Sequence, residues 1–289
     1  MKISAVIVSR NDNYGGNLKD RATYCINSAI ETYDEVFYVD WNSQTHSLFY
    51  DIEDNLKLKG NLNHVVITPE IASQLTNYDP NAQKCCEVLA RNIGLRRATG
   101  DWIVSTNIDI IAPKRKELEE TLNKSEDNTF YTISRRHLTW EMIEEFHGGK
   151  RKYDEWEKLR DHLIENSEER HLEEKTVTED DYSIINCCGD FQISTRHVWD
   201  EIRGMEEELI YPLYADTNVQ KKAAMHGFNL KALYNPALFH IDHGKGGGGF
   251  LTGINKLTNN PHRAITHQIK TQNPTNWGFA DIDIEYETI

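Results

Sequence analysis

The sequence predicts an α/β protein with a single doubly wound domain and a mostly parallel central sheet. Short apolar runs rich in β-branched residues recur along the first 115 residues, and each run ends in polar residues. Segments with apolar residues at helical spacing separate these runs. This alternation is typical of a sheet covered by helices on both faces, which binds ligands beyond the carboxyl ends of its strands.

The elements of the first half follow one another in a regular order. The expected strands span 3–8, 36–39, 65–67 and 102–106, and the expected helices span 18–32 and 87–98. A polar, glycine-containing loop follows the first strand, as expected where a buried strand ends. Gly100 stops the second helix, because glycine is favoured just beyond a helix C-terminus.

The second half begins with a change in composition. From 116 to 183 Glu, Lys and Arg prevail, and we interpret this stretch as a charged helical insertion interrupted by one strand at 129–133. Apolar residues return over 184–245, which we assign to the same domain. Within that stretch, helices are expected at 196–202 and 217–226 and a strand at 230–233. A glycine-rich loop and C-terminal tail are expected over 246–289.

The charge balance restricts the possible functions. The 289 residues include 46 acidic and 32 basic side chains, for a formal net charge of −14. Nucleic-acid binding relies on clustered Lys and Arg, so no nucleic-acid partner is expected. No apolar run approaches the roughly 20 residues that cross a bilayer, so no transmembrane segment is expected. Binding an anionic substrate would require local positive charge. Arg135-Arg136-His137 is a candidate for this role, unless this cluster only pairs with nearby Glu residues.

The five cysteines indicate a reducing compartment. They are Cys25, Cys85 with Cys86, and Cys187 with Cys188. Adjacent cysteines form disulfides only with strain, and this spacing is not that of zinc sites. We therefore expect buried, reduced thiols and a cytoplasmic protein.

The triplet Asn107-Ile108-Asp109 follows an expected strand and provides the first candidate site. A carboxylate between apolar neighbours is costly to bury unless a cation or hydrogen-bond donors meet it. A hard cation such as Mg2+ or Mn2+ suits this place, because such ions take carboxylates and substrate phosphates as ligands. A turn or helix-capping aspartate explains the triplet equally well, so the wider pattern has to decide.

Several short motifs stand in a characteristic order along the chain. An apolar first strand is followed by Asp40 at the end of the second strand, then by Arg91-Asn92-x-Gly94, and then by the DxD-like Asn107-Ile108-Asp109. In this order the chain resembles the GT-A glycosyltransferases, especially their family 2-like group, over roughly residues 1–115 and 184–245. The resemblance implies a Rossmann-like GT-A fold whose first 115 residues bind a nucleotide-sugar. Asn107 replaces the first acid of the DxD motif and retains an oxygen ligand without the charge.

The resemblance also implies roles for residues on the donor side. Ser9, Arg10 and Asn11 would line the nucleotide pocket, and Asp40 would contact the base or ribose. Arg91 would position the diphosphate or the DxD-like loop. The complete implied donor-binding set is Ser9, Arg10, Asn11, Asp40, Arg91, Asn107, Ile108 and Lys245. The alternatives are exposed or paired cations for the two arginines, and a turn cap for Asp40.

An acceptor side is implied by the second half. Asp190 precedes an expected helix, and Ala215-Asp216 begins another, where the family commonly has Glu-Asp. By resemblance, Asp216 would act as general base in an inverting transfer. The alternative for Asp216 is a helix N-cap. Trp277 is a candidate sugar platform, or else an aromatic residue that packs the tail onto the domain.

Two histidines, His240 and His243, complete the candidate metal site. GT-A enzymes often supply a histidine from this region, so the resemblance implies an ion held by Asp109 and His243 or His240. Structural histidines are the alternative. The glycine run 246–249 suits either a loop that closes on a ligand or a flexible linker, and Lys245 beside it would meet the diphosphate.

These features together predict transfer of a hexose-type sugar from a UDP- or GDP-sugar type donor to a glycan or other hydroxyl acceptor, with Mn2+ or Mg2+ as cofactor. A sugar-phosphate nucleotidylyltransferase is the second enzyme hypothesis, although Tyr14-Gly15-Gly16 is a poor match to the triphosphate loop of that class. A non-catalytic carbohydrate- or nucleotide-binding module is the third hypothesis. Asn107 and Ala215, which depart from the family pattern, keep it open.

Overall fold

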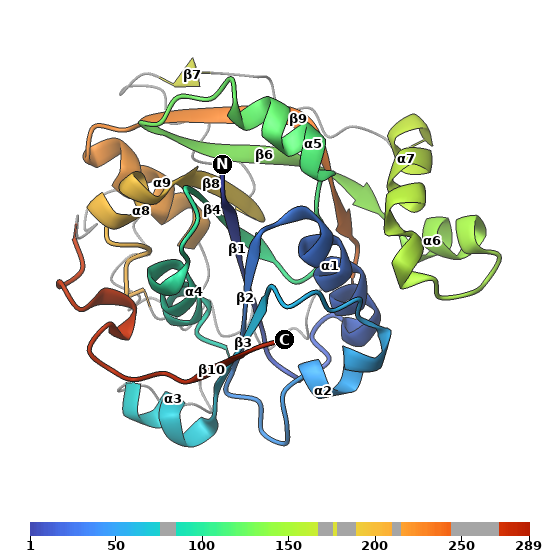
Figure 1. The fold of residues 1–289 in the computed structure, drawn as a ribbon, viewed down its shortest axis with the longest axis horizontal. Helices are drawn as coiled ribbons and strands as arrows, with labels where there is room; N and C mark the ends of the chain where they lie inside the picture. The colour runs from blue at the N-terminus through green and yellow to red at the C-terminus, as the bar shows by residue number, and fades with distance from the viewer. Residues whose placement is uncertain (76–84, 167–175, 178–188, 210–214, 244–271) are drawn as a thin grey trace, which may run out of the picture.

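The computed structural model describes residues 1–75, 85–166, 176–177, 189–209, 215–243 and 272–289. Its strands span Ile3–Ser9 (β1), Glu35–Trp41 (β2), Leu62–Ile67 (β3), Trp102–Asn107 (β4), Ile110–Ile111 (β5), Thr129–Leu138 (β6), Thr176–Val177 (β7), Phe191–Thr195 (β8), Asn229–Ile241 (β9) and Tyr286–Thr288 (β10). They form one sheet in the order β10-β3-β2-β1-β4-β8-β6-β9-β5, and β7 pairs with β9 (Figure 1).

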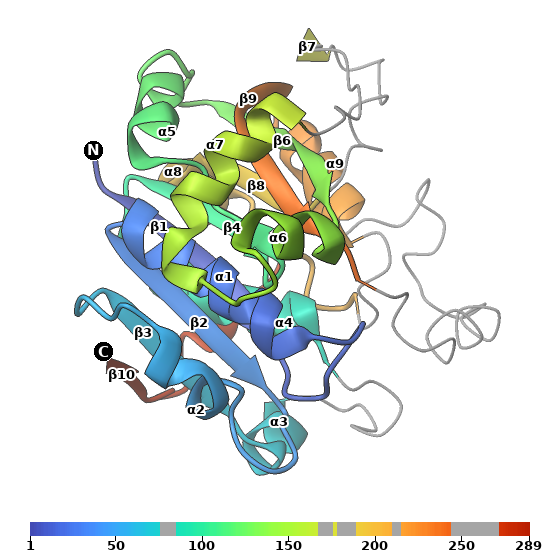
Figure 2. The ribbon, with the colours of Figure 1, turned by 90° about the vertical axis from the view of Figure 1, so that its right-hand side faces the viewer.

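Helices cover both faces of this sheet. They span Leu18–Thr32 (α1), Phe49–Ile52 (α2), Pro69–Leu75 (α3), Glu87–Arg97 (α4), Arg115–Leu122 (α5), Trp140–His147 (α6), Trp156–Asn166 (α7), Arg196–Glu201 (α8) and Ala215–Met225 (α9), with 3-10 turns at Glu53–Asn55 (η1), Tyr153–Glu155 (η2) and Trp277–Phe279 (η5). Helices α1 and α4 lie on opposite sides of the sheet (Figures 1 and 2). Side chains alternate between these sides along β1: Ala5 and Ile7 join the core beneath α1, whereas Val6 and Val8 join the core beneath α4.

The central strands β3, β2, β1 and β4 are parallel, as the sequence predicts. In their register Ser9 lies opposite Asp40, and Val8 lies opposite Asn107. The carboxyl ends of β1, β2 and β4 therefore meet at one edge of the sheet. This edge is where a doubly wound sheet binds its ligands.

The sheet is mixed beyond β4, which modifies the predicted, mostly parallel arrangement. Strand β8 runs antiparallel to both β4 and β6, and β5 runs antiparallel to β9, whereas β6 and β9 are parallel. Strand β10 adds an antiparallel strand at the other edge, beside β3. An apolar run predicts that a strand is buried but carries no information on its direction, which depends on how the connecting chain returns to the sheet.

The segment 116–183 supplies more than a helical insertion. Strand β6 lies inside the sheet, between β8 and β9. Helices α6 and α7 stand outside it and bury Ile143, Trp156 and Leu159 against β6 and β9. Arg160 of α7 is fully buried, and its guanidinium donates to Glu117 of α5 and to the carbonyl of Ala237.

The described part of the tail, 272–289, belongs to the domain. Tyr286 of β10 pairs with Val65 of β3. Trp277 of η5 is only 1% exposed, and the Arg96 guanidinium of α4 lies 5.1 Å from its ring centroid. The tail thus closes one edge of the sheet and covers α4.

The motif Arg91-Asn92-x-Gly94 joins three parts of the fold through α4. Arg91 donates to the Ser105 hydroxyl (2.8 Å) and to the Thr106 carbonyl (3.1 Å), which fixes the end of β4. Asn92 accepts from the Met205 N–H and donates to the Met205 carbonyl, both at 2.8 Å. At Gly94, an added Cβ would lie 2.5 Å from Cγ1 of Val6, so glycine permits the close approach of α4 to β1. The motif is therefore explained by packing and backbone bonding.

We expect Asn92→Ala to lower the free energy of unfolding by about 2–3 kcal/mol, because the buried Met205 N–H loses its acceptor. Urea denaturation followed by circular dichroism measures this change. Asn276→Ala is the matched control, since Asn276 is exposed and should change stability by less than about 0.5 kcal/mol. Equal losses in the two variants would refute the proposed role of Asn92.

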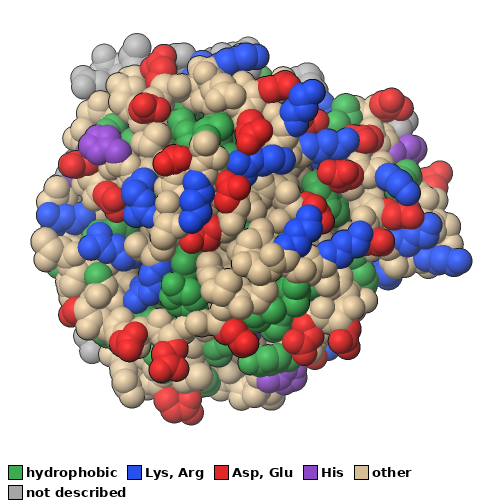
Figure 3. Space-filling model, in the orientation of Figure 1, with side chains coloured by type: hydrophobic (Ala, Val, Ile, Leu, Met, Phe, Trp, Pro, Cys, Tyr) green, Lys and Arg blue, Asp and Glu red, His purple; other side chains and the backbone are tan. Residues whose placement is uncertain are grey.

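Two further observations concern the charge on one face of the molecule and the length of its helices. Acidic and basic side chains are intermixed on the face seen in Figure 3, which shows no extended basic surface. Among the described helices, none is both long enough and apolar enough to cross a bilayer.

Candidate active site

Strand pairing brings Asp109 next to the two histidines predicted as metal ligands. Asp109 lies between β4 and β5, and Ile110 of β5 pairs with His240 of β9. The Ile241 N–H donates to the Asp109 carbonyl at 2.9 Å. His243 follows β9 directly, so both histidines reach the same carboxylate.

The Asp109 side chain is nearly inaccessible to solvent, with 4% of the residue exposed. Its Oδ2 lies 3.0 Å from Nη1 of Arg21 and 3.2 Å from Nε2 of His243. Its Oδ1 lies 3.7 Å from Nε2 of His240 and has no hydrogen-bond partner. Burial alone would raise the pKa of Asp109, but His243, His240 and Arg21 together hold it below its ordinary value. The carboxylate is therefore ionised, and one of its oxygens is available to a ligand.

These groups fit a divalent cation. The ligand atoms of Asp109, His240 and His243 all lie within 4.8 Å of one another, which suits a single ion. Burial lowers the pKa of His240 to about 4, although Asp109 opposes this shift, so its imidazole is neutral at physiological pH. A neutral imidazole and an unpartnered carboxylate oxygen are both competent metal ligands.

Arg21 is a residue of the site that the sequence analysis did not identify. It is fully buried in α1, and besides Asp109 it donates to the carbonyl of Gly16 at 3.2 Å and to that of Tyr14. A signal was present in the sequence. Position 21 shares a helical face with Leu18 and Cys25, and a cation on such a buried face requires an anionic partner.

Both ends of the Asn107 side-chain amide are hydrogen-bonded within the protein. Its Oδ1 accepts a hydrogen bond from Nη2 of Arg91, and its Nδ2 donates to Oδ1 of Asp190 at 2.6 Å. Asp190 in turn forms an ion pair with Arg135. Asn107 thus fastens the end of β4 to the residues that precede β8, and Asp109 alone of the DxD-like triplet presents a carboxylate. Ile108 is 8% exposed and packs in the core beneath α1.

The predicted donor-side residues gather around the ends of β1 and β2. The hydroxyls of Ser9 and Tyr38 lie 2.5 Å apart. Arg10 donates through Nε to the Asn42 carbonyl at 3.0 Å, and its buried Nη1 has no hydrogen-bond partner. Asn11 donates from its backbone N–H to the Ser43 hydroxyl at 2.8 Å. The loops after β1 and β2 are therefore tied together at the predicted nucleotide-binding edge.

Asp40 stabilises the loop after β2 at this edge. It is fully buried, and its Oδ2 accepts a hydrogen bond from the Leu48 N–H at 3.0 Å. Burial raises the pKa of Asp40 despite hydrogen bonds from Ser43 and Ser47. In this structure Asp40 holds the loop after β2, which is the turn-capping alternative considered for it.

Asp216, the predicted general base, lies in the first turn of α9. Its Oδ1 accepts from the Thr217 N–H at 2.8 Å and its Oδ2 from the Gly189 N–H at 3.1 Å. A Cβ at position 189 would lie 1.8 Å from Cβ of Asp216, so only glycine fits there. Each carboxylate oxygen keeps a second lone pair, so Asp216 can still accept a proton.

Glu87, at the start of α4, is influenced by the charges of both Asp109 and Asp216. Burial raises the pKa of Glu87 and the charge of Arg91 lowers it. The charges of Asp109 and Asp216 raise it further. Asp109 and Asp216 are therefore both within electrostatic reach of Glu87.

One predicted residue does not join this group, and another lies outside the described part of the chain. Trp277 is buried against α4 and Gly204, so it offers no ring face to a sugar, and the packing alternative accounts for it. Lys245 and the glycine run 246–249 lie outside the described residues.

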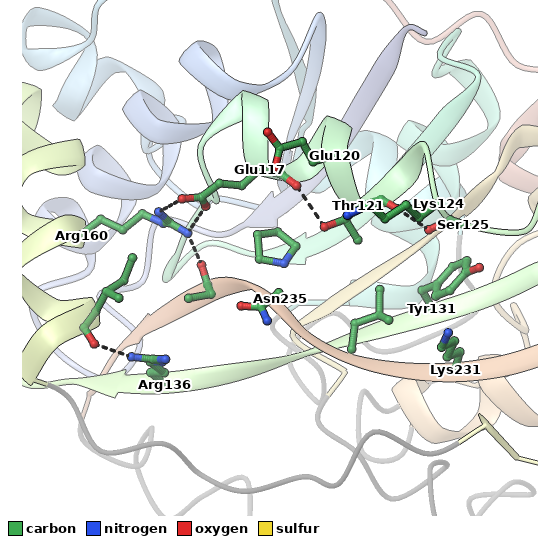
Figure 4. A pocket seen from close by; sticks show the side chains of 14 residues that line it. Glu117, Glu120, Thr121, Lys124, Ser125, Tyr131, Arg136, Arg160, Lys231 and Asn235 are labelled. Atoms are coloured by element: carbon green, nitrogen blue, oxygen red, sulfur yellow. Dashed lines mark hydrogen bonds and ion pairs between the residues drawn. The ribbon is translucent and has the colours of Figure 1, made fainter.

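A cavity of about 510 Å³ lies elsewhere, between α5, α7, β6 and β9 (Figure 4). Glu117 and Arg160, which line it, bind each other, and Arg136 donates to the Ile164 carbonyl at 2.9 Å. Lys231 and Ala237 of β9 face this cavity. His240 lies three residues after Ala237 on the same strand, so its side chain points to the opposite face of the sheet. The cavity is therefore separate from the Asp109 site.

No protein-family model matches the sequence, and no curated protein matches it. Two crystal structures of S. aureus TarS 1-349 share the fold. One gives a TM-score of 0.51 at 16% identity over 83% of this chain and 60% of the TarS chain. The other, in complex with UDP, gives a TM-score of 0.52 at 15% identity over 84% of this chain and 61% of the TarS chain. The chain thus spans about three fifths of the TarS 1-349 chains, and the GT-A-type α/β fold predicted from the sequence is confirmed.

Proposed function

We propose that this chain is a metal-dependent glycosyltransferase that moves a hexose-type sugar from a nucleoside-diphosphate donor to a hydroxyl acceptor. The observation that carries the proposal is the buried Asp109 carboxylate. One of its oxygens is unpartnered, and two histidines lie within reach of it. This group stands at the ligand-binding edge of a GT-A-type sheet.

The ligand set favours Mn2+ over Mg2+. Two imidazoles accompany a single carboxylate, and Mg2+ prefers oxygen ligands and retains much of its water. Arg21 already neutralises Asp109, so the protein alone offers the ion little net negative charge. Additional anionic ligands must come from the donor diphosphate, and we expect the donor and the ion to strengthen each other's binding.

The surroundings of the site support an anionic donor that arrives with a cation. Arg21 offsets the charge of Asp109, and the nearby carboxylates of Glu87 and Asp216 offer a diphosphate no positive charge, so the ion would supply it. TarS, which shares the fold, has been crystallised with UDP. We therefore propose a uridine-type donor and keep a guanosine-type donor as the comparison.

The proposed chemistry is an inverting transfer. An acceptor hydroxyl oxygen bonds to the anomeric carbon while the bond from that carbon to the diphosphate breaks, and Asp216 takes the hydroxyl proton. When bound, the divalent ion supplies positive charge to the departing diphosphate. Arg21 keeps Asp109 ionised and in place, and the N–H groups of Gly189 and Thr217 hold the Asp216 carboxylate.

A nucleotidylyltransferase fits the loop after β1 less well. In that class the loop presents N–H groups to a triphosphate, whereas here the carbonyls of Tyr14 and Gly16 point at Arg21. A binding module without catalysis would keep donor binding and lack turnover, so assays of both properties separate it from the enzyme.

Thermal unfolding with a panel of donors tests the proposal. We expect UDP-sugars with Mn2+ to raise the melting temperature by roughly 5–10 °C at a hundredfold excess over Kd, because only the native state binds them. Mn2+ alone, or the donor alone, should shift it far less. GDP-sugars, and a nucleoside triphosphate with a sugar 1-phosphate, form the comparison arms. The proposal is wrong if no nucleotide-sugar stabilises the protein with any divalent ion.

A further inference from the structure

Beside the Asp109 site lies a second group of titratable side chains, formed by His137, His240 and Asp242. His137 of β6 pairs with His240 of β9, and the two ring centroids are 5.7 Å apart. The Asp242 N–H donates to the Leu138 carbonyl at 2.7 Å, which fixes Asp242 next to both histidines. Strand pairing thus assembles the three side chains, although His137 stands more than 100 residues before Asp242.

The hydrogen bonds within this group have a definite direction. Oδ1 of Asp242 lies 2.5 Å from Nδ1 of His137 and 3.2 Å from Nδ1 of His240. An ionised carboxylate only accepts, so each imidazole donates its Nδ1–H. A neutral imidazole protonated at Nδ1 carries its lone pair on Nε2. For His240 that nitrogen is the one that lies 3.7 Å from the unpartnered Oδ1 of Asp109.

We propose that Asp242, held by His137, is a positioning residue that fixes the tautomer and orientation of His240 for metal binding. The inference rests on the proposed metal site and extends it to Asp242 and His137, for which the fold resemblance implies no role. Histidines that bind metals commonly donate their other N–H to a carboxylate, and loss of that carboxylate weakens metal binding about 10–100-fold.

The same three side chains are close enough to hold an ion themselves, and this alternative predicts a different stoichiometry. Both Nδ1 atoms are already directed at Asp242, however, so they donate hydrogen bonds where an ion would need lone pairs. Our inference therefore predicts one ion per chain, at Asp109, and not a second one at Asp242.

Mn2+ titration followed by electron paramagnetic resonance, with and without UDP, tests the inference on the full chain. We expect one Mn2+ per chain in the wild type, with two histidine 14N couplings in pulsed spectra. Asp242→Ala should bind Mn2+ about 10–100-fold more weakly and lose or weaken one 14N coupling. Asp242→Asn retains a side-chain oxygen acceptor and should recover part of the affinity, and His137→Phe should give an intermediate loss.

Asp283→Ala is the matched control, because it removes one exposed carboxylate from the tail and should leave Mn2+ affinity unchanged. Thermal unfolding of each variant without metal verifies folding, and His137→Phe and Asp242→Asn provide the test if Asp242→Ala does not fold. Wild-type affinity and unchanged 14N couplings in the folded variants would overturn the positioning role while leaving the proposed function intact. Two ions per chain would also overturn it. If the wild type binds no Mn2+ even with UDP, both proposals are wrong.

Discussion

Asp109→Ala should abolish Mn2+-dependent donor binding and lower the free energy of unfolding by about 3–5 kcal/mol, the largest structural effect that we expect from a single substitution. Two causes combine. The variant lacks the carboxylate that would hold the ion, and it leaves the fully buried Arg21 without its partner at 3.0 Å. Urea denaturation measures the stability, and thermal unfolding with UDP-sugar and Mn2+ measures the binding.

A double variant separates these causes. Replacing a buried ion pair by apolar side chains of similar volume is often neutral or stabilising, so Asp109→Leu with Arg21→Met should restore much of the stability. It should not restore Mn2+-dependent binding, because the ligand oxygen is still missing. If Asp109→Ala kept a full Mn2+-dependent shift, Asp109 would not be a metal ligand and the proposed mechanism would lose its basis.

Asp216→Asn is expected to reduce kcat about 10²–10⁴-fold while the affinity for the donor stays unchanged. The amide can accept hydrogen bonds from Gly189 or Thr217, as the carboxylate does, but it cannot take the acceptor proton. Steady-state kinetics with a verified acceptor give kcat, and the thermal shift with donor and Mn2+ shows whether donor binding survives.

Two comparison variants sharpen this test. Asp200→Asn changes an exposed carboxylate on α8 and should leave kcat unchanged. Glu87→Gln addresses the rival base, because Glu87 lies within electrostatic reach of Asp216. A large loss of kcat in Glu87→Gln together with normal turnover in Asp216→Asn would reassign the general base to Glu87.

The two predictions depend on different parts of the fold. The proposed metal site lies beside β5 and the end of β9, which meet through a short antiparallel pairing. The proposed base begins α9, and Asn92 on α4 fixes the turn at Met205 that precedes this helix. Asp109 variants should therefore impair metal binding without moving Asp216, and Asp216 variants should leave metal binding intact.

The sequence by itself determined the central elements in the first half of the fold. Buried parallel strands must be apolar on both faces, and helices must carry apolar residues at helical spacing, so β1, β2, β3, β4, α1 and α4 were predicted close to their observed bounds. The order of short motifs also led to Asp109, which follows a predicted strand, and the resemblance that this order supports led to His240 and His243.

Only the tertiary structure decided the partners of these residues. Arg21 lies 88 residues before Asp109, and His137 lies 105 residues before Asp242, and no local periodicity relates such positions. Strand direction and register brought them together. An apolar pattern specifies neither the direction nor the register with which β8 and β9 join the sheet. The same cause explains Asn107 and Trp277: their residue types suggested a ligand and a sugar platform. In the structure, Asn107 is hydrogen-bonded to Arg91 and Asp190, and Trp277 packs against Arg96 and Gly204. Both side chains therefore stabilise the fold.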